Sequence, residues 1–126
     1  MNLEKVVFGF FVLLAATLNL EFVYGDVANP DLHNAWELFA ATVVCLIAVV
    51  LKFGDRTHVG AMHLASSLVA LLQLLAAALV WFFAQKQGEP LSVGALGSVV
   101  SLAAGALLAN LVSVIIMIID TATLRR

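Results

Sequence analysis

The sequence predicts an all-α polytopic membrane protein, an antiparallel bundle of four transmembrane helices in up-down-up-down order. Four apolar stretches, at 6–24, 36–53, 62–84 and 91–119, occupy nearly all of its 126 residues. Hydrophobic residues make up 63% and charged residues 11% of the chain. Roughly 20 mainly apolar helical residues cross a bilayer core, so each stretch is read as one transmembrane helix. Together they leave no room for a soluble domain. We expect residues 1–126 to form a single integral membrane domain.

The first two helices are expected over about residues 5–24 and 30–53. The first apolar run is long and lacks a convincing small-residue cleavage site, so we expect it to be retained rather than removed as a signal peptide. Asn29 followed by Pro30 is typical of an N-cap and a first helical position, which predicts the start of the second helix.

The third and fourth helices are expected over about residues 58–84 and 91–120. Gly54 favours the end of the second helix, and Asp55 or Thr57 is able to cap the third. Gly88 and Pro90 separate the third helix from the fourth. All connections are short, which favours antiparallel neighbours.

Loop charges predict the orientation of the chain. The first loop has no lysine or arginine, whereas the second carries Lys52 and Arg56, and the ends carry Lys5, Arg125 and Arg126. Placing both termini on the side of the second loop collects five of the six basic residues there. The positive-inside rule then predicts cytoplasmic N and C termini, and the bias argues against dual topology.

Small residues recur at every fourth position of the fourth predicted helix: Gly97, Ser101, Gly105, Ala109 and Ser113. Such residues let helix backbones approach closely in lipid. Two interpretations stay open, packing within the bundle and an interface with a homo-oligomer or a partner helix.

Two amides are expected deep in the bilayer, Gln73 in the third helix and Asn110 in the fourth. Each must point into the bundle and find a hydrogen-bond partner. They either join helices or line a polar pathway.

Polar side chains also gather at the outward end of the first hairpin: Asn19, Glu21, His33, Asn34 and Glu37. His33 and Glu37 are four residues apart and would share a helical face, and antiparallel packing places Glu21 at a similar depth. The cluster is either an interfacial hydrogen-bonded group or a site that handles ions or protons. A single His-x-x-x-Glu pair is too little to predict a metal site.

The cytoplasmic turn concentrates charge in Lys52, Asp55, Arg56 and His58. It is either a solvated turn or a contact for a partner or an anionic lipid headgroup. Asp120, near the same membrane face, is expected to pair with Arg56 or the terminal arginines. Aromatic residues at the outward helix ends predict an anchoring belt, formed by Tyr24, Trp36, Trp81, Phe82 and Phe83.

No catalytic constellation is present in the sequence. It has no nucleophile with a plausible base, no phosphate-binding glycine loop and no Cys/His metal pattern, so we expect neither enzymatic activity nor a cofactor. Cys45, the single cysteine, is typical of a small core residue. Six scattered basic residues provide no footprint for nucleic acid.

Residues 33–41 (HNAWELFAA) and 51–61 (LKFGDRTHVGA) resemble segments of an uncharacterised family of small bacterial four-helix inner-membrane proteins. The resemblance implies a bacterial cytoplasmic membrane and no activity. Two functions remain as expectations. The first is a non-catalytic accessory or assembly subunit of a larger membrane complex. The alternative is a small homo-oligomeric ion or proton transporter or channel that uses Glu21, His33 and Glu37.

Overall fold

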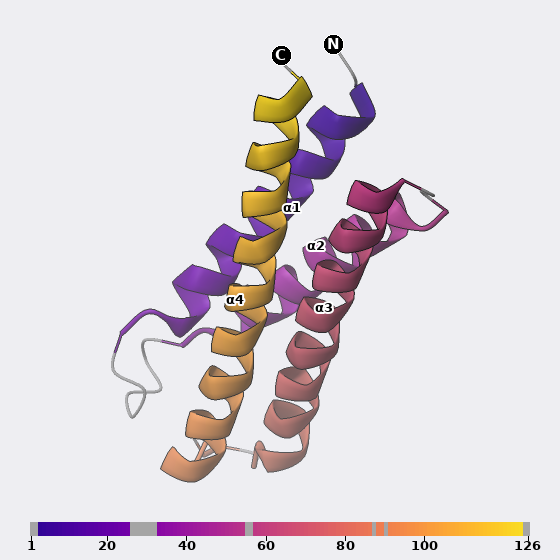
Figure 1. Ribbon diagram of the computed structural model, residues 1–126. Helices are drawn as coiled ribbons and strands as arrows, with labels where there is room; N and C mark the ends of the chain where they lie inside the picture. The colour runs from indigo at the N-terminus through magenta and orange to yellow at the C-terminus, as the bar shows by residue number, and fades with distance from the viewer. Residues whose placement is uncertain (1–2, 26–32, 55–56, 87, 90, 125–126) are drawn as a thin grey trace.

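Four helices form the protein in a computed structural model that describes residues 3–25, 33–54, 57–86, 88–89 and 91–124. They are α1 (Leu3–Val23), α2 (Ala35–Lys52), α3 (His58–Ala84) and α4 (Val93–Leu124) (Figure 1). Each is long and apolar enough to span a membrane. The described residues contain no β-strand. The all-α fold class is therefore confirmed.

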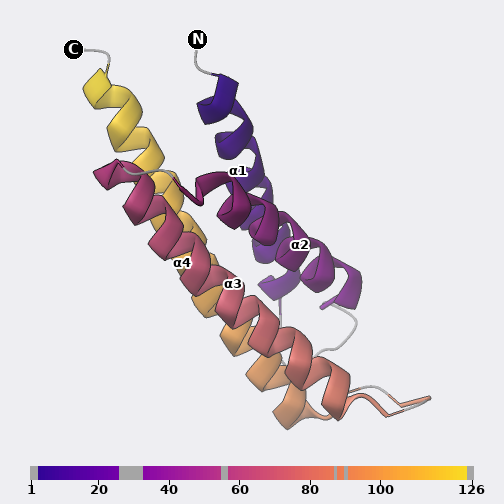
Figure 2. The same ribbon diagram turned by 90° about the vertical axis from the view of Figure 1, so that its right-hand side faces the viewer.

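The helices form a four-sided antiparallel bundle. Extensive contacts join α1 to α2, α2 to α3, α3 to α4 and α4 back to α1. The two ends of the chain lie together at one end of the bundle (Figure 1). Because α3 has 27 residues and α4 has 32, against 21 and 18 in α1 and α2, the α3–α4 hairpin extends past the first hairpin (Figure 2).

The start of α2 differs from the prediction. This helix begins at Ala35, and Asn34 is its N-cap, with a side-chain oxygen that accepts a hydrogen bond from the Trp36 backbone N–H at 2.9 Å. His33 is held outside the helix by a bond to the end of α1, and this tertiary contact favours the later cap. Asn29 and Pro30 lie outside the described residues.

The other boundaries are closer to expectation. The first helix, α1, begins at Leu3, two residues earlier than predicted. The fourth, α4, occupies Val93–Leu124 rather than 91–120. The Thr57 hydroxyl caps α3 by accepting a hydrogen bond from the Gly60 N–H at 2.9 Å, as predicted. Gly54 follows the C-cap of α2 with φ +88°, a conformation that favours glycine.

The core of the bundle is narrow and rich in alanine. Its largest fully buried apolar side chains are Phe22, Leu38, Leu74 and Leu96. Between them the helices approach through buried alanines, namely Ala15, Ala41, Ala70, Ala77, Ala103 and Ala106. Large apolar side chains such as Phe10, Val43, Leu72 and Ile115 are exposed instead. This distribution suits helices that face lipid on the outside and one another on the inside.

Candidate functional site

At the end of the bundle where α1 leads into α2, the His33 side chain is buried against the last turn of α1. Its Nδ1 lies 2.6 Å from the Phe22 carbonyl oxygen. Because a carbonyl oxygen only accepts, this ring nitrogen donates the hydrogen bond. The Phe22 ring contacts both His33 and Trp81, with ring centroids 5.8 Å and 6.2 Å apart. His33 therefore ties the start of α2 to the end of α1, and Phe22 contacts α3.

Glu21 and Glu37 come together across the α1–α2 interface. Their carboxyl groups lie close enough to interact directly, and they can share a hydrogen bond only when one of them is protonated. Glu21 is exposed, and Glu37 is half-buried. The two carboxyl groups are the part of the predicted cluster able to attract a cation or hold a proton. Among the described residues, no group of three or more histidine, cysteine, aspartate or glutamate side chains is placed to hold a metal ion.

The two asparagines of the predicted cluster do not join it. Asn34 serves as the cap of α2. Asn19 is fully buried and faces α4, where its amide nitrogen donates to the Ala103 carbonyl at 2.8 Å and its amide oxygen accepts from the Leu107 N–H at 3.0 Å. These two backbone groups are four residues apart, so they are the natural partners in a helical hydrogen bond. Asn19 thus ties α1 to the backbone of α4.

Deeper in the bundle, polar groups link α2, α3 and α4. The Cys45 thiol lies 3.5 Å from the Ser67 carbonyl oxygen and 4.0 Å from Oδ1 of the buried Asn110. The hydroxyls of Ser66 and Ser113 are hydrogen-bonded to each other. Asn110 therefore points into the bundle, as expected, and these contacts join helices. Sequence reasoning missed the role of Cys45, because an isolated cysteine carries no spacing signal.

Gln73 is half-buried between α3 and α4. Its Oε1 is enclosed without a conventional hydrogen-bond partner. A Cβ added at Gly105 would lie 2.2 Å from this oxygen. The amide therefore occupies space that glycine leaves open at position 105.

The predicted stripe on α4 does not form a single face. Each step of four residues turns the helix by about 400°, so successive members drift by about 40°. Ala109 and Ser113 are buried and Gly105 packs against Gln73, whereas Gly97 is only half-buried and Ser101 is exposed. The buried line instead alternates spacings of three and four residues, through Leu96, Val99, Ala103, Ala106, Asn110 and Ser113.

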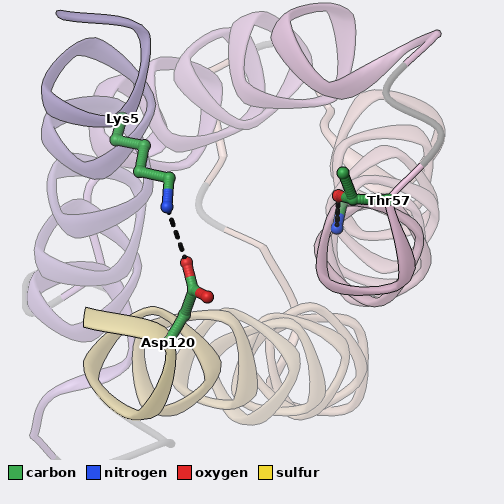
Figure 3. A network of polar contacts seen from close by, with 4 residues as sticks. Lys5, Thr57 and Asp120 are labelled. Atoms are coloured by element: carbon green, nitrogen blue, oxygen red, sulfur yellow. Dashed lines mark hydrogen bonds and ion pairs between the residues drawn. The ribbon is translucent and has the colours of Figure 1, made fainter. Parts of the chain in front are cut away.

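The opposite end of the bundle contains a pocket of about 1130 Å³ between the ends of all four helices, which we call the vestibule. Its polar wall is formed by Glu4, Lys5, Lys52, Thr57, His63 and Asp120. Figure 3 looks into this end, where Lys5 on α1 and Asp120 on α4 point toward each other. The Lys5 ammonium lies 3.0 Å from the Asp120 carboxylate.

Two charged residues at this end have contacts that the sequence did not predict. Asp120 pairs with Lys5, because the antiparallel order brings the first turn of α1 beside the last turns of α4. Lys52 turns inward, with its ammonium 4.4 Å from the centroid of the Phe8 ring. His58 is exposed, while Asp55, Arg56 and the terminal arginines lie outside the described residues.

The fold defines a small polytopic protein of the all-α class, with four helices able to span a membrane. The chain belongs to a family of unknown function (DUF6394), whose model matches residues 32–121. The match covers α2 and α3 and most of α4, so Lys5, Asn19 and Glu21 lie outside it. Comparison with curated proteins and with solved structures finds no match.

Proposed function

We propose that this protein is a non-catalytic accessory or assembly subunit of a larger membrane complex. In this proposal it is a multi-pass protein of a bacterial cytoplasmic membrane, with both termini in the cytoplasm. The orientation rests on the charge bias of the loops. The subunit role rests on one surface of α4, described next.

The first half of α4 presents small residues to the outside of the bundle. We call this surface the α4 small-residue face; it consists of the exposed residues Gly94, Ser98, Ser101 and Ala104. A Cβ added at Gly94 would meet nothing within 4 Å. Small residues on a lipid-facing surface gain little from lipid, but they let a second helix approach closely.

The hydroxyl groups of the two serines on this face also favour contact with a partner helix. Within the described part of the chain, the Ser98 and Ser101 hydroxyls make no hydrogen bond. By contrast, Thr17 and Thr42 donate to carbonyl oxygens one turn earlier in their own helices. A hydroxyl without a partner is costly in hydrocarbon. A transmembrane helix with small residues and an exposed acceptor would fit this face.

Site-specific photo-crosslinking in native membranes tests the proposal. A photoreactive residue at Ser98 or Ser101 is expected to give one crosslinked product with a different protein. The matched control is Ala65, a small exposed residue on α3, where no such product is expected. A product at twice the mass of this chain would indicate a homo-oligomer and contradict the subunit role. Equal crosslinking at Ala65 and Ser101 would also contradict it.

The alternative function, a small homo-oligomeric ion or proton transporter, is supported by the Glu21–Glu37 pair. The pair lies at one end of the bundle, and the fully buried Phe22, Leu38 and Leu74 fill the core. Any pathway would therefore run between copies rather than through one bundle. Proton flux in liposomes containing only this protein, abolished by Glu37→Gln, would favour the transporter over the subunit.

A further inference from the structure

We propose that the vestibule binds the headgroup of a glycerophospholipid that carries both a phosphate and a primary amine, as phosphatidylethanolamine does. This proposal is independent of the partner on α4. The vestibule lies at the ends of spanning helices, the level at which lipid headgroups sit. At about 1130 Å³ it is large enough for a headgroup and its glycerol.

The positive side of the vestibule comes from two different helices. Lys5 on α1 bonds to Asp120, and because an ammonium has three N–H donors, this bond leaves donors for a ligand oxygen. Lys52 on α2 lies against the Phe8 ring, and this cation–π contact holds its ammonium at the wall. A phosphate placed between the two lysines would therefore meet ammonium groups from both α1 and α2.

The carboxylates of the vestibule favour a headgroup that carries a positive charge in addition to its phosphate. Among the described residues of this wall, the two lysines are matched by two carboxylates, those of Glu4 and Asp120. Such a balance suits a zwitterion better than a polyanion, because a polyanion would meet uncompensated repulsion. A primary amine also donates hydrogen bonds to carboxylates, which a quaternary choline group is unable to do.

An apolar groove beside the vestibule identifies the ligand as a lipid rather than a soluble phosphate. A second pocket of about 210 Å³ is lined by Val59, Ile116, Ile119 and Asp120. It shares Val59 and Asp120 with the vestibule, so the vestibule, whose wall is partly polar and partly apolar, continues into an apolar groove between α3 and α4. A headgroup in the vestibule would place an acyl chain along this groove.

Native mass spectrometry of the full-length protein provides the test. The protein is reconstituted in nanodiscs with equal amounts of phosphatidylethanolamine, phosphatidylglycerol and phosphatidylcholine that carry identical acyl chains. The released protein is expected to retain one phosphatidylethanolamine in preference to the other two. Lys52→Gln is expected to lower the retained fraction about fivefold, the usual contribution of one basic residue near a membrane surface.

Three further variants distinguish binding in the vestibule from a general effect of charge and from misfolding. Lys86→Gln removes a lysine that does not line the vestibule, and it is expected to leave retention unchanged. Lys52→Arg keeps the charge and is expected to restore retention. Thr121→Trp fills the vestibule without a change of charge and is expected to abolish retention, while circular dichroism shows unchanged helix content.

Several outcomes would overturn the proposal. Equal retention of the three lipids would contradict the proposed selectivity for the headgroup. An equal loss of retention in Lys86→Gln and Lys52→Gln would show that the lipid does not bind in the vestibule. Displacement of the lipid by millimolar phosphoethanolamine would show that the headgroup alone binds, which would assign the vestibule to a soluble ligand.

Discussion

Two amide side chains in the interior illustrate, at the scale of single residues, how the bundle accommodates polar groups. Asn19 finds a donor and an acceptor in the backbone of α4. Gln73 instead directs its oxygen at Gly105, where the absence of a side chain allows a short approach. Asn19 therefore has backbone partners, whereas the Gln73 oxygen has none and depends on the space that glycine leaves.

This geometry predicts the effect of a single methyl group at Gly105. Gly105→Ala would place a Cβ 2.2 Å from the Gln73 oxygen, and because this oxygen ends a flexible side chain that is able to move, we expect a loss of about 1 kcal/mol, the low end of the usual cost of overpacking. The measurement is unfolding of the detergent-solubilised protein in increasing SDS. Because Gln73→Ala removes the obstructing atom, the double variant is expected to regain most of the loss.

Gly94→Ala is the matched control for that substitution. A Cβ at Gly94 would meet nothing within 4 Å, so this variant of the isolated protein should keep its stability or gain slightly through helix propensity. Equal stability of the Gly105→Ala and Gly94→Ala variants would show that the position of the Gln73 side chain does not require a glycine at residue 105.

At the scale of elements, the first hairpin attaches to α4 through contacts spread along α1. Asn19 bonds the backbone of α4, Gly9 packs against Met117, and Lys5 pairs with Asp120. The ion pair is partly exposed and is expected to contribute little to stability. Asn19 is therefore the main polar link between α1 and α4.

Replacing Asn19 by leucine tests this link. Both hydrogen bonds to α4 would be lost, but the Ala103 carbonyl and the Leu107 N–H, four residues apart in a continuous helix, remain partners for each other. We therefore expect a destabilisation of about 0.6–1.7 kcal/mol in SDS unfolding. Thr17→Val removes a hydroxyl that bonds only within α1, so it is the control and should have a smaller effect. Equal effects of the two variants would contradict the link.

At the scale of the whole molecule, the two ends of the bundle differ. One end carries the vestibule and both chain ends, and the other carries the Glu21–Glu37 pair and the α3–α4 turn. The predicted orientation places the vestibule in the cytoplasm. Exposed aromatic residues, including Trp36, Phe82 and Phe83, belong to the opposite end, as an anchoring belt would require.

Cysteine labelling of intact cells tests this orientation. In a Cys45→Ala background, His58→Cys and Glu89→Cys place single thiols at exposed positions near opposite ends of α3. A membrane-impermeant maleimide is expected to label Glu89→Cys from outside and His58→Cys only after permeabilisation. The reverse pattern would place the vestibule outside and contradict the positive-inside assignment.

Much of the fold was predictable because it depends on local properties. Length and apolar composition predict four spans. Thr57 signals a helix start through its side-chain hydroxyl, and Gly54 signals a helix end through its positive φ. The start of α2 was not predictable, because Asn29 and Asn34 are both acceptable caps. The contact of His33 with Phe22 favours Asn34, and this contact exists only after α1 and α2 have packed together.

The candidate site was predictable only in part. Antiparallel helices place residues at similar depths, which is enough to bring Glu21 near Glu37. Depth alone does not give the direction of a side chain, so Asn19 faces α4 rather than the cluster. The five residues of the predicted small-residue stripe differ in burial, because a spacing of four drifts around a helix that repeats every 3.6 residues.

The sequence by itself determined the class of protein, the order of its helices and the residue types available at each depth, because hydrophobic length and loop chemistry are local properties. The tertiary structure decided which polar groups meet. It paired Lys5 with Asp120, buried Ala109 and Ser113 of the stripe while leaving Ser101 on the α4 small-residue face, and formed the vestibule. These outcomes depend on the rotation of each helix about its axis, which is set by packing against its neighbours.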